Sequence, residues 1–390
     1  MSARGEPASP ALLAAAGRAA DAAGRAADAG RRAADAGRRA TDAGRRATDA
    51  AGTRAYIVGP AYDWAFFLLP PVVALAVGAL IAGTPLTDTT FELSGERTTW
   101  AGLFIGTLIH GHLAAVFLRS HGNADIFRRH RLRFVVAPVA AFAAMMLSMW
   151  AVVCVTVLVV FWDVYHSALQ TFGLGRIYDA RAGNDPALGR RLDLWLNHLL
   201  YAGPIVAGAT MIFHFESFDA FDDVGAALLS SVPARMASNH RYIGWAVIAA
   251  GTVFLLYYAL AYRAMARRGY KVSFPKVWLL VSTGLCSIYT WGFNPWGQAF
   301  FIMNLFHAVQ YLALVWWSEG GRLRRRLRLD RPRAGRLVAV AAFLGGVLAY
   351  GLWAELAPAE SRALWSLTQT VALMHFWYDG FIWSVTRKQV

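Results

Sequence analysis

The stretch FVVAPVAAFAAMMLSMWAVVCVTVLVV occupies residues 134–160 and contains no charged side chain. A helix needs about 20 mainly apolar residues to cross a lipid bilayer, so this stretch predicts membrane-spanning structure. With the residues that follow it, the stretch forms either one long helix or two adjacent spans, 134–151 and 152–174. The number of crossings here sets the orientation of every later segment, so this choice decides the fold.

Ten segments of suitable length and apolar character lie along the chain when 134–174 is counted as two spans. Prolines at 70–71, 138 and 204 are expected to kink their helices and not to end them, because lipid offers the backbone no alternative to helix. The ten predicted spans are 63–83, 100–118, 134–151, 152–174, 192–213, 241–262, 277–293, 297–317, 337–357 and 363–386.

The basic residues of the connections alternate from one side of the membrane to the other. Every second connection is basic, and these together carry 24 Lys and Arg, whereas the others carry only Arg97, Arg235, Arg241 and Arg362. Basic residues accumulate on the cytoplasmic side of a membrane. A single span at 134–174 would place all later basic loops on the outer side, against this rule. The sequence therefore predicts an all-α, polytopic membrane helix bundle of about ten transmembrane helices. Both termini are expected in the cytoplasm, and the membrane is expected to be the bacterial inner membrane.

The composition also indicates a membrane protein. Hydrophobic residues make up 57% of the 390, and charged residues make up 16%. The formal net charge of +14 comes largely from arginines that lie between apolar runs, which argues against nucleic acid as a partner. The two cysteines, Cys154 and Cys286, each lie within an apolar run and lack metal-ligand spacing, so we interpret them as packing residues.

Residues 1–55 form a separate segment in which Arg and Asp recur every seven residues, beginning at Arg18 and Asp21. Asp–Arg pairs four residues apart and an alanine seam favour a helix, but one glycine in each repeat costs roughly 1 kcal/mol. We predict a low-complexity tail that is disordered or weakly helical, followed by a transmembrane domain at 56–390. A helix at the membrane surface or a weak self-association segment remains an alternative for the tail.

Polar residues inside the predicted spans are the candidates for function, because an Asp at the centre of a span costs about 2.5–3.5 kcal/mol on insertion scales. They recur at spacings of three or four residues, so most of each set projects from one face of its helix. In the predicted orientation they all lie in the cytoplasmic half of the membrane. The motifs are LIHGHL with His110 and His112, FWDVYHSALQ with Asp163, His166 and Gln170, NLFHAVQ with Asn304, His307 and Gln310, and MHFWYD with His375 and Asp379.

Imidazole and carboxylate groups that face inward at one depth on several helices are how helix bundles build metal sites. Ligands of this kind without thiolate suit iron, zinc or manganese, and we predict iron in a mononuclear or dinuclear site, with zinc and manganese as alternatives. Any single intramembrane His is more often a hydrogen-bonded packing residue than a ligand, so the prediction depends on four helices showing His at matching depth, and each Asp is either a ligand or a partner of a ligand His. The predicted metal ligands are His110, His166, His307, His375, Asp163 and Asp379, and the residues predicted to deliver protons or hold water are His112, Gln170 and Gln310.

The order of these motifs resembles that of the bacterial beta-carotene 15,15'-dioxygenase family, which are membrane proteins related to bacteriorhodopsin systems. The resemblance implies a membrane-embedded non-haem iron that cleaves carotene to retinal. It departs from the family pattern at Ile109, where the family has Pro, at Tyr311, where it has a second His, and in the His–Asp spacing of the last motif. The segments that carry the resemblance are IHGHL at His110, YHSALQTFG at His166, FHAVQYLALVW at His307, and HFWYDGFIW at His375 with Asp379.

The sequence thus favours an integral membrane metalloenzyme, an oxygenase, hydroxylase or desaturase that acts on a lipophilic small molecule reaching the site from the bilayer. An electron donor is a further candidate partner, and the oligomeric state is left open. The alternative is a proton-coupled transporter or permease that uses the same His and Asp residues as a proton relay. No internal repeat supports that alternative.

Overall fold

The computed structural model describes residues 55–329, 334–357 and 360–383, so the predicted tail lies almost wholly outside the described residues. Helices dominate, and the only strands among the described residues form one short hairpin. In chain order the elements are α2 (Pro60–Asp63), the π-helix η1 (Trp64–Leu68), α3 (Pro70–Ile81), α4 (Pro85–Asp88), β1 (Thr90–Leu93), β2 (Glu96–Thr99), α5 (Trp100–Ser120), α6 (Ala124–Leu147), α7 (Met149–Arg181), α8 (Arg190–Ala207), α9 (Met211–Phe215), the 3-10 helix η2 (Glu216–Val224), α10 (Ala227–Ser230), α11 (Val232–Arg267), α12 (Phe274–Phe293), α13 (Trp296–Arg326), α14 (Ala334–Leu356) and α15 (Arg362–Ile382).

The protein is an all-α, multi-pass membrane protein, as its sequence predicts. Six of the described helices are long and apolar enough to cross a membrane, and the number rises to eight if each of two bent helix pairs is one span. Each of the ten predicted spans coincides with a helix or a bent pair, but α12 and α15 do not reach the apolar character of the others. The count of ten therefore stays a prediction.

Ser148 separates the two helices that the opening stretch of sequence left undivided. Its backbone is extended (φ −136°, ψ 126°), and its side chain accepts a hydrogen bond from the backbone N–H of Ala151, which caps α7. Pro138 lies inside α6. Close to Pro70 and Pro71, a 48° bend at Leu69 separates η1 from α3. Pro204 lies inside α8, which ends three residues later at Ala207, and a 103° bend separates α8 from α9.

The connection before α5 contains structure that the sequence analysis did not anticipate. Strands β1 and β2 pair antiparallel, from Thr90 opposite Thr99 to Leu93 opposite Glu96. The two residues between them, Ser94 and Gly95, both have positive φ (53° and 89°), which is the conformation of a two-residue hairpin turn. Glycine adopts this conformation without steric cost at the second position.

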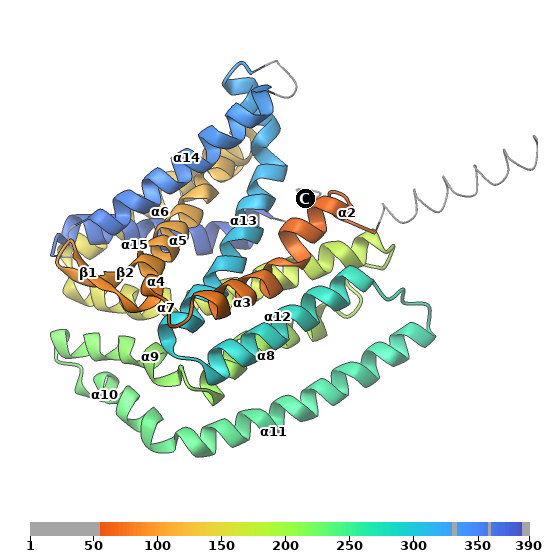
Figure 1. Ribbon diagram of the computed structural model, residues 1–390, viewed down its shortest axis with the longest axis horizontal. Helices are drawn as coiled ribbons and strands as arrows, with labels where there is room; N and C mark the ends of the chain where they lie inside the picture. Colours follow the sequence, from red (N-terminus) through yellow and green to blue (C-terminus); the bar gives the residue numbers. More distant parts are fainter. Residues whose placement is uncertain (1–54, 330–333, 358–359, 384–390) are drawn as a thin grey trace, which may run out of the picture. The chain divides into compact units, whose positions relative to one another are not determined.

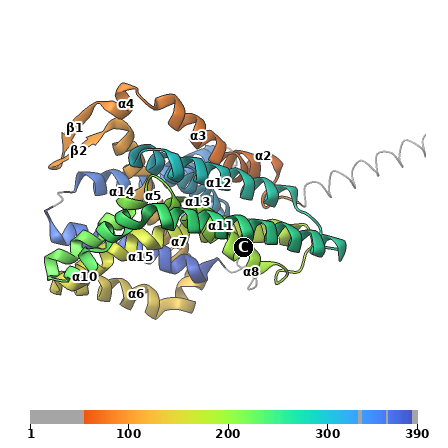
Figure 2. The ribbon, with the colours of Figure 1, turned by 90° about the horizontal axis from the view of Figure 1, so that it is seen from below.

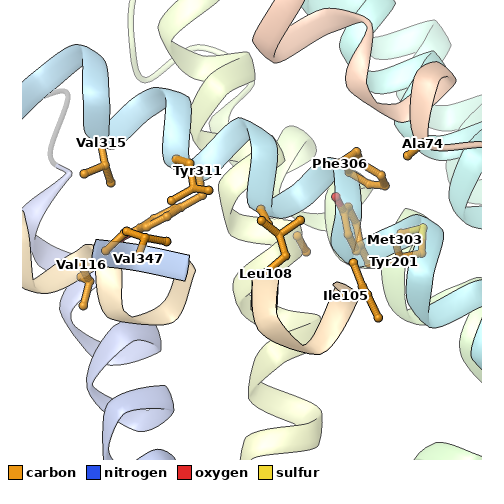
Figure 3. Close-up of a cluster of buried hydrophobic side chains, with 14 of the residues drawn as sticks. Ala74, Ile105, Leu108, Val116, Tyr201, Met303, Phe306, Tyr311, Val315 and Val347 are labelled. Carbon is orange, nitrogen blue, oxygen red and sulfur yellow. The ribbon is translucent and has the colours of Figure 1, made fainter. Parts of the chain in front are cut away.

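Helix α13 forms the centre of the bundle and packs against α3, α5, α12 and α14 (Figures 1 and 2). In its most apolar part 78% of the residues are buried inside the protein, against 39% or less for the other five long apolar helices. Figure 3 shows Met303, Phe306, Tyr311 and Val315 along this helix among side chains from four other helices. By contrast α11, along one edge in Figure 1, leaves most of its apolar side chains exposed, which is expected of a helix that faces lipid.

Helices α5 and α14 approach each other more closely than large side chains would allow. A Cβ atom on Gly351 would overlap the carbonyl oxygen of Thr107, and one on Gly111 would lie 2.8 Å from the carbonyl oxygen of Val347. Small residues at such crossings are common in membrane bundles, because the helices gain van der Waals contact when their backbones meet. This contact fixes the rotation of α5 about its axis, and hence the direction of its histidines.

Candidate metal centre

Four buried histidines on four helices meet in the interior of the bundle. They are His112 on α5, His166 on α7, His307 on α13 and His375 on α15, and each is at most 4% exposed. The ring centroids of neighbouring pairs lie 4.6–5.2 Å apart. We call these four residues and Asp379 the histidine cluster.

Asp379 brings a carboxylate to the cluster. Its Oδ2 atom lies 3.8 Å from Nε2 of His166 and 3.8 Å from Nε2 of His375, and those two nitrogens lie 3.1 Å apart. A point equidistant from the three atoms is about 2.1 Å from each, which is within the range of metal–nitrogen and metal–oxygen bonds at protein sites. The three donor atoms are thus spaced as ligands of one ion.

The hydrogen bonds around His375 leave its Nε2 lone pair directed at this point. The Nδ1 atom of His375 lies 3.1 Å from the carbonyl oxygen of Leu113, which can only accept a hydrogen bond. Nδ1 therefore carries the proton, and Nε2 is the unprotonated nitrogen of a neutral ring. Histidines that bind metals commonly donate their other N–H to a backbone carbonyl in this way, which fixes tautomer and ring orientation.

His112 and His307 contribute unsatisfied nitrogens to the same interior. Neither ring nitrogen of either residue makes a hydrogen bond of good geometry among the described residues, although the backbone of Leu108 and Ile109 lies close to the His112 ring. Leaving one buried polar group unpaired costs about 1–3 kcal/mol, so four such atoms side by side point to a bound group that pairs with them. Single donor atoms of His112, His307 and His375 all lie within 4.8 Å of one another, so His375 belongs to both possible groups of ligands.

The donor set suits a divalent transition metal. Two imidazoles and one carboxylate with further positions open are the ligands of non-haem iron(II) oxygenases, and the absence of thiolate in the set disfavours soft metals. His112 and His307 add two imidazoles on the neighbouring side. The residues present therefore fit iron, zinc or manganese, with iron favoured by the 2-His-1-carboxylate group.

The structure places His112 in the cluster and His110 outside it, which reverses the roles predicted for the two. Residues two apart on a helix point about 200° from each other, so only one of them can face the centre. Nδ1 of His110 lies 2.8 Å from Oε1 of Glu355 on α14. The prediction that His110 converges with the other imidazoles is therefore wrong.

Asp163 also lies apart from the histidine cluster, although it is on the same helix as His166. It lines a cavity on the side of the cluster that faces the amino-terminal ends of α5, α7, α13 and α15. The geometric groups of possible ligands among the described residues do not include it. Of the two predicted aspartates, only Asp379 is placed where it can bind the metal.

The two predicted glutamines make hydrogen bonds that link α13 to α7 and to η1. Nε2 of Gln310 donates to the carbonyl oxygen of Phe67 at 2.7 Å, in the π-helix η1. Nε2 of Gln170 donates to the carbonyl oxygen of His307 and to Oε1 of Gln310, both at 3.1 Å. An irregular helix leaves carbonyls that must find donors inside the protein, and Gln310 supplies one. Both amide nitrogens are thus engaged, and only Oε1 of Gln170 stays without a partner among the described residues.

A second cavity, of about 500 Å³, opens from the cluster toward the basic loops. His166, Tyr311 and Asp379 line its inner end, and Arg190 lies at its other end, so we call it the Arg190 cavity. Along α7, α13 and α15, most residues that line the Asp163 cavity precede the cluster histidine, and most that line the Arg190 cavity follow it; the exceptions lie within one turn of the histidine and are Trp162, Tyr165, Ser167 and Phe376. These three helices therefore run in one direction past the cluster, as the predicted alternation of spans requires.

Sequence reasoning missed the side chains that hold Asp379. Its Oδ1 atom accepts hydrogen bonds from the Tyr311 hydroxyl (2.9 Å) and from Nε1 of Trp383 (2.8 Å), which leaves Oδ2 for the cluster. The guanidinium of Arg119 lies 3.9 Å from the Trp383 ring centroid and pairs with Glu319 at 2.8 Å. In the sequence Tyr311 stands at the position where the resembling family has a second His and was given no role, because hydrogen bonds between distant helices leave no spacing signal.

Replacing Trp383 with Phe is expected to lower the affinity for metal about tenfold, because the ring is kept while the N–H that orients Asp379 is lost. Chelator competition on the purified protein measures the affinity. Trp377→Phe is the matched control, since Trp377 lies on the same helix and makes ring contacts with Tyr378 and Phe381. An equal loss in both variants would show that Trp383 acts through packing alone.

A buried network of charges, also missed from the sequence, joins the helices beside the cluster. Asp179 and Asp193 each accept from both Arg176 and Lys276 at 2.5–2.7 Å, and all four residues are at most 5% exposed. The hydroxyls of three tyrosines complete the hydrogen bonds of the two carboxylates, namely Tyr258, Tyr262 and Tyr270. Two cations and two anions balance, so the network serves to hold α7, α8, α11 and α12 together.

The chain was compared with protein-family models, with curated proteins and with solved structures, and none of these comparisons gives a match.

Proposed function

We propose that the protein is an integral membrane metalloenzyme that oxidises a lipophilic small molecule, with iron in the histidine cluster. One observation carries the proposal: four buried imidazoles and a carboxylate from four helices converge, and four of their nitrogens make no hydrogen bond of good geometry among the described residues. A bundle that only needed to pack would fill this space with apolar side chains, since unpaired buried nitrogens are destabilising.

Within this proposal His166, His375 and Asp379 hold the ion, and His112 and His307 face it from the neighbouring side. The metal supplies activation of dioxygen, the chemistry that oxygenases, hydroxylases and desaturases share. Leu113 fixes the tautomer of His375 through its carbonyl, and Tyr311 and Trp383 hold Oδ1 of Asp379. The apolar interior around the cluster keeps bulk water away from the reacting groups.

The membrane arrangement belongs to the same proposal. Ten spans with both termini in the cytoplasm of a bacterium place the Arg190 cavity on the cytoplasmic side, where an electron donor would reach the protein. The parallel course of α7, α13 and α15 supports this arrangement. The segments that resemble the beta-carotene dioxygenase family all contribute to the cluster, so carotenoids stand beside fatty acyl chains and terpenoids as candidate substrates.

The proposal is tested by dioxygen uptake of the iron-loaded protein in nanodiscs, supplied with a bacterial lipid extract and with ascorbate as the electron source. Uptake should depend on the extract and fall at least about tenfold in His166→Ala, since removal of a ligand removes the metal site. His198→Ala is the control, because His198 lies on α8 and its Nδ1 is hydrogen-bonded to the carbonyl of Leu194. Uptake that is unchanged in His166→Ala would refute the proposal.

The transporter alternative is favoured by one feature, the presence of a cavity on each side of the cluster. It predicts that metal-free protein in liposomes still moves protons, and that removal of the metal changes nothing. Proton flux that persists at full rate in chelator-treated liposomes, together with no dioxygen uptake, would favour transport over catalysis.

A further inference from the structure

The Asp163 cavity, of about 250 Å³, lies one helical turn from the histidine cluster, toward the amino-terminal ends of the cluster's helices. Most of its wall is apolar, with Val159, Val160, Phe300 and Met303 among the lining residues. Tyr201 and Met303, two of its lining residues, appear next to each other in Figure 3. A mainly apolar cavity with a few polar groups is the usual form of a small-molecule site.

Asp163 is a carboxyl group in the wall of this cavity that none of the described residues supplies with a hydrogen bond or an ion pair. Neighbouring polar groups are engaged elsewhere: the Tyr201 hydroxyl bonds Thr171, and Nδ2 of Asn304 donates to the carbonyl of Phe300. A carboxyl group inside a membrane bundle needs a partner, and here a bound molecule can provide it.

His110 adds a second polar group with a free ring nitrogen to the same cavity. Its Nδ1 is held at 2.8 Å from Glu355, and its ring lines the cavity. The carboxylate of Glu355 keeps a proton on Nδ1, so Nε2 accepts a hydrogen bond in the neutral ring and donates one in the charged ring, and a hydroxyl can serve as partner in either case. The carboxylate of Glu355 packs against Gly106, and a Cβ atom on that glycine would overlap the carboxylate. The pairing of His110 with Glu355 therefore depends on glycine at 106.

The cavity borders the histidine cluster directly. The ring of Phe376 lines the cavity and lies 5.1 Å from the ring of His166 and 5.6 Å from that of His375. Leu113, whose carbonyl fixes His375, lines it too. A molecule in this cavity is thus separated from the cluster by one aromatic ring.

We propose that the Asp163 cavity binds a lipophilic alcohol, whose hydroxyl donates to Asp163 or His110 and whose hydrocarbon part lies against the apolar wall beside Phe376. The identification of this alcohol as the substrate rests on the proposed function, whereas its binding does not. A hydroxyl can both donate and accept, so it satisfies an isolated carboxyl group that a pure hydrocarbon would leave unpaired. A cationic ligand is disfavoured because only Asp163 would be available to neutralise it, since the carboxylate of Glu355 is already paired with His110.

The size of the cavity limits the ligand. A cavity of 150 Å³ accommodates benzene, so one of about 250 Å³ accommodates about ten non-hydrogen atoms. The ligand is therefore a short alcohol or the hydroxyl end of a longer chain that leaves the cavity between the helices.

Photolabelling of the full-length protein in nanodiscs with a diazirine derivative of 1-octanol tests the proposal. We expect adducts on the cavity wall, at Val160 and Met303, that excess 1-octanol removes and excess octane does not. Loss of one hydrogen bond to the hydroxyl should weaken labelling about tenfold in Asp163→Leu, which removes both acceptor oxygens at similar volume. Gly106→Ala, which displaces Glu355 without changing a titratable group, should weaken it as well.

Thr156→Val is the matched control, because Thr156 lies on the same helix as Asp163, its hydroxyl donates to the carbonyl oxygen of Val152, and it does not line the cavity. Unfolding midpoints of all variants check that labelling is compared between folded proteins. Adducts confined to exposed residues such as Val139 and Leu256, or labelling that is unchanged in both Asp163→Leu and Gly106→Ala, would overturn the proposal. His166→Ala separates the two proposals, because it should abolish dioxygen uptake and leave labelling intact.

Discussion

Replacing His166 and His375 together with alanine is expected to lower the metal content of the purified protein from about one ion per chain to less than about 0.2. His375 belongs to both groups of possible ligands and His166 to one, so the double variant leaves only Oδ2 of Asp379 in the first group and only His112 and His307 in the second. Neither remainder supplies the three protein ligands of a 2-His-1-carboxylate site. Elemental analysis of detergent-solubilised protein measures the outcome.

The control for this experiment is a pair of histidines outside the cluster. His121 contacts Phe134 and Tyr378, and His198 bonds the carbonyl of Leu194, so a His121→Ala and His198→Ala double variant removes two imidazoles and should retain its metal. Metal below about 0.2 per chain in the unaltered protein after reconstitution with each candidate ion would refute the metal site. Equal metal content in the two double variants would also refute the assignment of His166 and His375 as metal ligands.

The second large effect is expected from Lys276→Met, which should lower the free energy of unfolding by about 3–5 kcal/mol, the usual cost of removing one partner from a buried ion network. Lys276 is 2% exposed and donates to both Asp179 and Asp193 at 2.7 Å. Without it, two buried carboxylates share only Arg176 as a cation. Denaturant or thermal unfolding in detergent measures the change.

Two further variants show whether charge balance is the cause. Lys276→Met combined with Asp179→Asn restores one cation to one anion, so this double variant should be more stable than Lys276→Met alone. Lys271→Met removes an exposed charge from the connection just before α12, the helix that carries Lys276, and should change the stability by less than about 0.5 kcal/mol. A Lys276→Met variant as stable as Lys271→Met would show that the network contributes nothing.

Much of the fold could be predicted because membrane insertion imposes local rules. A span must be about 20 apolar residues of helix, so the positions of the helices follow from hydrophobicity alone. The charge alternation correctly separated α6 from α7, although the break at Ser148 lies three residues before the predicted boundary. The bend after Ala207 was not anticipated because the apolar run continues past it to Phe213, so hydrophobicity does not mark the break. The hairpin at 90–99 was not anticipated because its strands are only four residues long.

For the site, the sequence identified the right helices and was less accurate about their side chains. Periodicity relates residues within one helix, so His166 and Gln170, or His375 and Asp379, could be assigned to common faces. It cannot give the rotation of one helix relative to the next. That rotation follows from packing, as where Gly111 and Gly351 let α5 and α14 meet.

The sequence by itself determined an all-α membrane bundle, the helices that carry the polar residues, and that His166, His307 and His375 lie at one level of it. Only the tertiary structure decided that His112 and not His110 faces the centre, that Asp163 lines a separate cavity, and that Tyr311 and Trp383 hold Asp379. The physical reason is that hydrophobicity and helical period act locally along the chain. Partners such as His110 and Glu355, 245 residues apart, meet only when whole helices pack.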